Sequence, residues 1–197
     1  MIRVGITGSM GSGKSYCSKK FEELGIPVFY SDDVARSVIN TNLNLKREIC
    51  KEFGNVYDED GMMIPQIIRS MVYVEGAQDK LDKLNSLVHP YVFQEYESFC
   101  NTHKDKKYTL AESAILFESG LDKVVDKVIY VSTDEETRIQ RTFKRSGFSR
   151  EEYKQRMKGQ IPNKETLSDF IITNNDGDDV EKQIKEVNIC ISHYHHT

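Results

Sequence analysis

Near its amino end the chain reads Gly8-Ser9-Met10-Gly11-Ser12-Gly13-Lys14-Ser15, and this stretch decides the fold. It fits the pattern G-x-x-x-x-G-K-S/T, which is typical of a loop that binds phosphate groups. Glycine tolerates a positive φ, so successive backbone N–H groups can turn inward and form a concave site for an anion. Lys14 can then reach the β- and γ-phosphates of a nucleotide, and the Ser15 hydroxyl can bind Mg²⁺.

The segments on either side of this motif predict the strand, loop and helix that it requires. Residues 2–7 precede it and are typical of a short buried strand. After it, Cys17, Phe21 and Leu24 fall at i, i+4 and i+7, which predicts the apolar face of a helix. Gly25 suits the position just past the end of that helix. A glycine-rich turn beside an unrelated lysine is the alternative, and it does not account for this context.

The composition of the chain excludes several broad classes of protein. Its 197 residues are 38% hydrophobic and 29% charged, which predicts a soluble globular domain. No apolar run approaches the roughly 20 residues of a membrane span, and a strand at the amino end argues against a signal peptide. The four cysteines are scattered, which favours reduced thiols in the cytoplasm over a disulfide or zinc framework. A net charge of −4 gives no general attraction to nucleic acid.

Four further apolar runs, rich in Val, Ile and Tyr, predict short buried strands at residues 28–30, 108–111, 128–131 and 170–173. Helical patterns separate them, which favours an α/β fold with a five-stranded parallel sheet flanked by helices. Residues from about 33 to 105 show much helical pattern and little strand. We therefore expect a helical insertion there, within a single domain that spans the chain.

Positive charge is concentrated between residues 138 and 158. Within that segment Arg138, Arg141 and Arg145 fall at i, i+3 and i+7, on one face of a helix. Guanidinium groups suit a polyphosphate, whose charge is spread over several oxygens. The alternative is a solvated face that pairs with the acidic residues 135–136.

Two capping-box pairs place helices around this charge. Thr133 with Glu136, and Ser149 with Glu152, have the required spacing, and Gly147 lies between the two predicted helices. We expect these helices, at roughly residues 134–160, to form a basic lid.

Three further side chains could take part in chemistry. Asp32 directly follows the second predicted strand and could accept the proton of an attacking hydroxyl, or simply cap the next helix. Glu112 ends the third strand and could help to hold Mg²⁺, or be a polar strand end. His89 could contact a substrate phosphate, or only close a helical turn.

Three classes of phosphate-loop protein compete for this sequence. A GTP-dependent switch needs Asn-Lys-x-Asp to bind guanine, but residues 163–166 read Asn-Lys-Glu-Thr and lack the aspartate. A nucleotide-binding module without catalysis does not explain Asp32 beside a basic lid. A small-molecule kinase explains the loop, the lid and a second region for the acceptor, so we favour it.

Most of the chain resembles one kinase family, dephospho-coenzyme A kinase, through the order and spacing of many short segments. Related nucleotide kinases share the phosphate loop but not the His-Pro and Leu-Phe-Glu segments. The resemblance is carried by Gly5-Ile6-Thr7-Gly8 through Ser15, Gly25-Ile26-Pro27-Val28, Tyr30-Ser31-Asp32, Ala35-Arg36, Val72-Tyr73, Leu84 to Pro90, Ile115-Leu116-Phe117-Glu118, Arg141 with Arg145, Gln155-Arg156-Met157-x-x-Gln160, Asp169-Phe170-Ile171-Ile172 and Asn174-Asn175-Asp176-Gly177.

The resemblance implies transfer of the γ-phosphate of ATP to the ribose 3′-hydroxyl of dephospho-coenzyme A, the last step of coenzyme A synthesis. It implies a P-loop kinase core, a helical acceptor-binding region and a two-helix lid, with Mg²⁺ as cofactor. The expected partners are these two small molecules, with neither nucleic acid nor membrane, and the chain is expected to be a monomer or weak homo-oligomer.

The resemblance also distributes roles over the residues quoted above. Catalysis is expected from Asp32, Lys14 and Arg141. The residues expected to bind the acceptor are Asp32, Arg36, His89 and Glu118. The expected Mg²⁺ ligands are Ser15 and Glu112. The expected ATP-binding residues are Gly8, Met10, Gly11, Ser12, Gly13, Lys14, Ser15, Tyr16, Arg141 and Arg145.

The chain departs from the family pattern at three positions. Tyr30 stands where the first aspartate of Asp-x-Asp is usual, although the second is kept as Asp32. Pro65 occupies the usual place of a basic residue in the acceptor region. Ala114 replaces a customary proline, which we expect to alter only the shape of a loop.

Overall fold

The computed structural model of the chain describes residues 1–72 and 76–194. Tyr73, which belongs to one of the segments that carry the family resemblance, lies outside these residues. The chain divides into two compact units: Met1–Tyr30 with Cys100–Thr197, and Ser31–Phe99. The helical insertion that the sequence predicts at roughly residues 33–105 stays a prediction.

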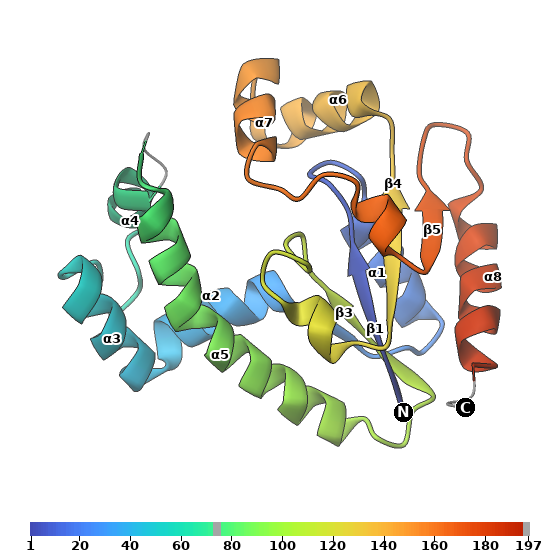
Figure 1. Cartoon of the computed structure of the whole chain (residues 1–197), viewed down its shortest axis with the longest axis horizontal. Coiled ribbons are helices and arrows are strands. Elements are labelled where there is room, and N and C mark those ends of the chain that lie inside the picture. The colour runs from blue at the N-terminus through green and yellow to red at the C-terminus, as the bar shows by residue number, and fades with distance from the viewer. Residues whose placement is uncertain (73–75, 195–197) are drawn as a thin grey trace. The chain divides into compact units, whose positions relative to one another are not determined.

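The first unit is built on a five-stranded parallel sheet with the strand order β2-β3-β1-β4-β5 (Figure 1). The prediction of five parallel strands in an α/β fold is confirmed. The register places Glu112 at the end of β3 level with Ile6 on β1 and with Tyr30 on β2. The strands are β1 (Ile2–Thr7), β2 (Val28–Tyr30), β3 (Tyr108–Glu112), β4 (Lys127–Ser132) and β5 (Phe170–Thr173).

Helices α1 (Lys14–Glu23) and α8 (Val180–Ser192) share one apolar core with the sheet. Cys17 and Phe21 of α1 are fully buried in it, as predicted. Leu24 was predicted to join them but is 41% exposed, because α1 ends at Glu23 and Leu24 falls after its last turn. Gly25 follows with a φ of 82°, as expected of a residue just past a helix end.

Two helices, α6 (Glu135–Ser146) and α7 (Arg150–Met157), form the predicted pair around Gly147. The capping box of Ser149 and Glu152 is confirmed at the start of α7. The predicted capping box of Thr133 and Glu136 is wrong. Helix α6 begins one residue later than that pair requires, with Asp134 as its N-cap and no side-chain capping bond. The remaining short helical turns of this unit are η1 (Leu121–Val124) and η2 (Lys164–Leu167).

The second unit contains helices α2 (Ser31–Thr41), α3 (Leu43–Phe53), α4 (Pro65–Val72) and most of α5 (Gln78–Thr102). Asn42 separates α2 from α3 and caps α3 by accepting hydrogen bonds from two N–H groups of its first turn. At 25 residues α5 is the longest of these helices. Neither it nor any other helix within residues 1–72 and 76–194 is long and apolar enough to cross a membrane.

Phe21 is buried and Leu24 is exposed, and this difference allows a test of the core. Phe21→Ala should lower the free energy of unfolding by about 3–5 kcal/mol, because it leaves a cavity between α1 and the sheet. Leu24→Ala, the control, should change it by less than about 0.5 kcal/mol. Urea unfolding followed by circular dichroism measures both values, and equal losses would contradict this burial pattern.

Candidate active site

The phosphate-binding motif forms a loop between β1 and α1. Gly11 and Gly13 have φ of 84° and 87°, which lie in the left-handed region that only glycine adopts without strain. Helix α1 starts at Lys14, so the free N–H groups of its first turn lie at the end of the loop. These N–H groups and the helix dipole make this an attractive site for an anion.

Close packing is a second reason why Gly11 and Gly13 cannot carry a side chain, and it applies to Gly8 as well. A Cβ atom on Gly13 would overlap the side-chain Nδ2 of Asn174. A Cβ atom on Gly11 would lie 2.8 Å from Thr142 Oγ1, and one on Gly8 would lie 2.8 Å from the Val131 carbonyl oxygen. The loop is therefore held between α6 on one side and the ends of β4 and β5 on the other.

Lys14 and Ser15 meet a buried carboxylate at the carboxyl edge of the sheet. The Ser15 hydroxyl donates to Glu112 Oε1 over 2.8 Å, and the Lys14 ammonium lies 3.6 Å from the same oxygen. Glu112 is only 7% exposed, so solvent screens its contacts with these two side chains poorly. The predicted residues Lys14, Ser15 and Glu112 are thus brought together.

This group of side chains also fits Mg²⁺. Magnesium prefers oxygen ligands, and in phosphate sites it usually takes one or two from the protein and the others from phosphate and water. The Ser15 hydroxyl and the Glu112 carboxylate supply two such oxygens within 2.8 Å of each other.

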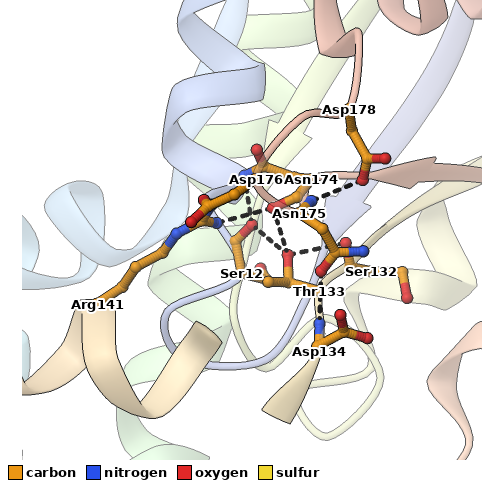
Figure 2. Close-up of polar contacts among 9 residues, drawn as sticks. All are labelled: Ser12, Ser132, Thr133, Asp134, Arg141, Asn174, Asn175, Asp176 and Asp178. Atoms are coloured by element: carbon orange, nitrogen blue, oxygen red, sulfur yellow. Dashed lines mark hydrogen bonds and ion pairs between the residues drawn. The ribbon is translucent and has the colours of Figure 1, made fainter. Parts of the chain in front are cut away.

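The predicted lid arginines lie in different environments. Arg141 donates through Nη1 to the Asn174 carbonyl oxygen over 2.8 Å and through Nη2 to Asp176 Oδ1 over 3.0 Å (Figure 2). The Arg138 guanidinium lies 5.9 Å from the centre of the Tyr153 ring, and Arg145 is exposed in the last turn of α6.

Two further contacts bear on the lid. Tyr153 of α7 donates through its hydroxyl to the Met10 carbonyl oxygen over 3.4 Å, so this hydrogen bond holds the second lid helix against the phosphate loop. Glu136, which the alternative of a solvated face would pair with these arginines, pairs with Arg150 at 2.6 Å.

Asp32 and Arg36 belong to the second unit. Helix α2 begins at Ser31, directly after β2, so Asp32 and Asp33 both lie in its first turn, where negative charge is favourable. Asp33 pairs with Arg36 at 3.2 Å, whereas Asp32 is exposed and has no such ion pair among the described residues.

His89 lies in α5 and is half-buried. Its ring stacks on Phe93, with 6.2 Å between the ring centres. Burial lowers the pKa of His89 below its ordinary value, so the imidazole is neutral near pH 7. It can therefore exchange hydrogen bonds with a substrate, but it adds no positive charge.

A buried lysine that the sequence did not single out holds Glu118. Lys164 is 3% exposed, and its ammonium lies 2.7 Å from Glu118 Oε1 and 3.0 Å from the Ala114 carbonyl oxygen. The same Glu118 oxygen accepts from the Ile161 N–H over 2.9 Å. These contacts fasten the segment after the lid to the loop after β3. The proposed contact of Glu118 with the acceptor stays a prediction.

The structure shows the local setting of the three residues that depart from the family pattern. Tyr30 donates through its hydroxyl to Glu22 on α1 over 2.8 Å, which ties β2 to that helix. Pro65 is the first residue of α4, a position where its missing N–H costs nothing. Ala114 offers its carbonyl oxygen to Lys164, as described above.

Comparison with known proteins identifies the family. A family model described as dephospho-CoA kinase matches residues 2–179. The chain belongs to the dephospho-CoA kinase family. Curated relatives named dephospho-CoA kinase include one from Fusobacterium nucleatum, 32% identical over 92% of this chain and 94% of the relative. Another, from Bacillus thuringiensis subsp. konkukian, is 35% identical over 89% of each chain.

Solved structures agree with this family in fold. A protein from Thermus thermophilus has a TM-score of 0.80 at 24% identity, covering 99% of this chain and 98% of the other. Dephospho-CoA kinase from Campylobacter jejuni has a TM-score of 0.69 at 24% identity, over 96% of each chain. Shikimate kinase from Acinetobacter baumannii, with a TM-score of 0.53 at 18% identity, covers 98% of this chain and 94% of the other. The predicted P-loop kinase fold is therefore confirmed.

The buried ion pair predicts a large loss of stability when one partner is removed. Lys164→Met should lower the free energy of unfolding by about 3 kcal/mol, because the Glu118 carboxylate then lacks its counter-charge. Replacing both residues, with Glu118→Gln as well, should recover part of that loss. Lys127→Met is the control, because its ion pair with Asp169 is more exposed and should be worth at most about 1 kcal/mol. Urea unfolding measures these values. A Lys164 variant as stable as this control would contradict a buried ion pair between Lys164 and Glu118.

Proposed function

We propose that this chain transfers the γ-phosphate of ATP to the ribose 3′-hydroxyl of dephospho-coenzyme A and so forms coenzyme A. The observation that carries the proposal is the match of residues 2–179 to the dephospho-CoA kinase family. The group of Lys14, Ser15 and Glu112 beside a glycine-rich loop supports the phosphate-transfer chemistry.

On the donor side, the loop N–H groups and Lys14 hold the phosphates of ATP. Binding of a phosphate gives the Lys14 ammonium an anion to neutralise in addition to Glu112. Ser15 and Glu112 would hold Mg²⁺, which neutralises charge on the phosphate oxygens when it is bound. Positioning and charge stabilisation supply most of the rate, because the transition state of phosphoryl transfer is loose.

On the acceptor side, Asp32 is the proposed base. Its exposed carboxylate follows the end of β2 by two residues, and the neighbouring Arg36 is occupied by Asp33 instead. In the proposed mechanism Asp32 orients the ribose hydroxyl and accepts its proton. Arg36, His89 and Glu118 are proposed to contact the acceptor.

The lid is proposed to complete the site. Arg141 exchanges its contact with Asp176 for the phosphates, because the exposed Asp176 carboxylate binds it only weakly. Arg145, which is exposed on the same helix, joins it. Closure of the lid excludes water, which would otherwise hydrolyse ATP.

The proposal extends to the cellular setting. We expect a cytoplasmic enzyme that works as a monomer or weak homo-oligomer on small-molecule substrates, without nucleic acid.

The reaction can be tested by measuring ADP release from ATP and Mg²⁺ with and without dephospho-coenzyme A. Release that depends on this acceptor, with a mass gain of one phosphate in the product, is the expected result. Nucleoside monophosphates run in parallel are the control. Stimulation by a nucleoside monophosphate alone would contradict the proposal and indicate a nucleotide kinase.

Asp32→Asn should lower kcat by roughly 10²–10⁴-fold, because the amide cannot accept the hydroxyl proton. Binding of ATP, measured by calorimetry, should be unchanged. Asp33→Asn is the matched control: it removes a neighbouring carboxylate whose ion pair with Arg36 lies at the surface, and it should keep near-normal turnover. Equal turnover in the two variants would remove Asp32 from its proposed role.

Arg141→Ala should slow transfer by about 10³-fold, the scale expected for an arginine that stabilises the transition state of phosphoryl transfer. The melting temperature should fall little, because the ion pair with Asp176 is largely exposed. Arg150→Ala, which removes a lid arginine paired with Glu136, should turn over at close to the wild-type rate. An unaffected Arg141 variant would contradict the proposed role of this side chain in phosphate transfer.

A further inference from the structure

The carbonyl oxygen of Ser12, inside the phosphate loop, is held by side chains that follow two other strands (Figure 2). Asn174, directly after β5, donates through Nδ2 to this oxygen over 2.7 Å. The hydroxyl of Thr133, directly after β4, lies 3.0 Å from the same oxygen. We call this arrangement of Asn174 and Thr133 around the Ser12 carbonyl oxygen the Ser12 clamp.

The Ser12 clamp is buried. Ser12, Thr133 and Asn174 are 1%, 7% and 9% exposed. Water therefore competes weakly for these groups, and a Ser12 carbonyl oxygen that lost the hydrogen bond from Asn174 would keep only the Thr133 hydroxyl nearby, whose single proton is shared among the carbonyl oxygens of Ser12, Ser132 and Asn174. The clamp thus fixes the direction of the Ser12 carbonyl bond.

A fixed carbonyl direction also fixes the next N–H. The peptide group is planar and trans, so the N–H of Gly13 points opposite to the C=O of Ser12. With the carbonyl directed at Asn174 and Thr133, the Gly13 N–H is directed away from them. A flip of this peptide, which the positive φ of Gly13 makes accessible, would instead present an oxygen to a phosphate.

From this geometry we propose that Asn174 is a positioning residue for the phosphate loop, with Thr133 as its second member. Its amide sets the orientation of the peptide between Ser12 and Gly13, so that an N–H and not a carbonyl oxygen faces the bound phosphate. The proposal deepens the proposed function, because it rests on the loop being the site of the ATP phosphates.

The same residue links the loop to the lid. The backbone carbonyl oxygen of Asn174 accepts from Arg141 Nη1 over 2.8 Å, and the Thr133 hydroxyl lies 3.2 Å from it. Asn175 next to it accepts from the N–H of Asp134 at the start of α6. The segment after β5 therefore sets both the peptide of the loop and the resting position of a lid arginine.

The proposal can be tested by substituting Asn174 and measuring by calorimetry the affinity for ATP and for inorganic tripolyphosphate, each with Mg²⁺. Asn174→Leu keeps the side-chain shape and removes the donor, and it should weaken both ligands by about 10- to 100-fold, the loss expected for a hydrogen bond to a charged group. Asn174→Asp places an acceptor against the Ser12 oxygen and should weaken them more. Thr133→Val should weaken them less, and Thr133→Ser, which keeps the hydroxyl, should restore binding.

If Asn174 had only a structural role, its substitution would lower stability without weakening the binding of tripolyphosphate more than control substitutions do. Asn175→Leu and Thr109→Val are the matched controls, because they remove a neighbouring asparagine amide and a buried threonine hydroxyl that contacts Cys100. They should lower the melting temperature but leave tripolyphosphate binding unchanged. Equal tripolyphosphate affinity in Asn174→Leu and wild type would overturn the proposal, and so would a wild-type protein that binds neither ligand. Weakened binding in this variant together with no phosphorylation of any acceptor by the wild type would uphold the positioning role and contradict only the proposed reaction.

Discussion

The hydrogen bond from Asn174 to the Ser12 carbonyl oxygen joins residues 162 positions apart, and the phosphate loop depends on it. The contact exists because all five strands are parallel and leave the sheet at one edge. Strands β1, β4 and β5 are consecutive neighbours in the sheet, so the residues that follow them meet. The core of α1, α8 and the sheet therefore supports the geometry of the loop at a distance.

The other side of the loop depends on charge. Glu112 ends β3, next to β1, and its buried carboxylate holds the side chains of Ser15 and Lys14. A loop of N–H groups with a lysine would repel a divalent cation, whereas one carboxylate beside a hydroxyl favours it. The two sides of the loop thus serve different ends: the Ser12 clamp orients N–H groups toward phosphate, and Glu112 supplies negative charge for a cation.

Most of the fold could be predicted from the sequence, because short apolar runs and the glycine motif are local signals. All five strands were expected at nearly their observed bounds. Leu24 was assigned to the buried face because an i, i+7 spacing takes no account of where the helix ends. Lys14, Ser15 and Glu112 were expected together because parallel strands share one carboxyl edge.

The parts of the site that were missed depend on contacts between distant segments. Thr133 has the spacing of a capping residue, but its hydroxyl lies among carbonyl oxygens of Ser12, Ser132 and Asn174. Lys164 was considered only as part of a guanine-binding pattern, whereas burial beside Glu118 gives it a structural role. No local pattern could reveal either contact, because the partner residues come from other strand ends.

The central claim, that the framework of the sheet aims the Gly13 N–H at a bound phosphate, can be measured directly by nuclear magnetic resonance. In ¹⁵N-labelled protein, addition of ATP and Mg²⁺ should move the Gly13 amide proton strongly downfield, because a hydrogen bond to a charged phosphate deshields it. The same titration of Asn174→Leu at saturating ATP should show a smaller shift. A Gly13 amide proton that stays in place while other loop amides respond to ATP would contradict this account.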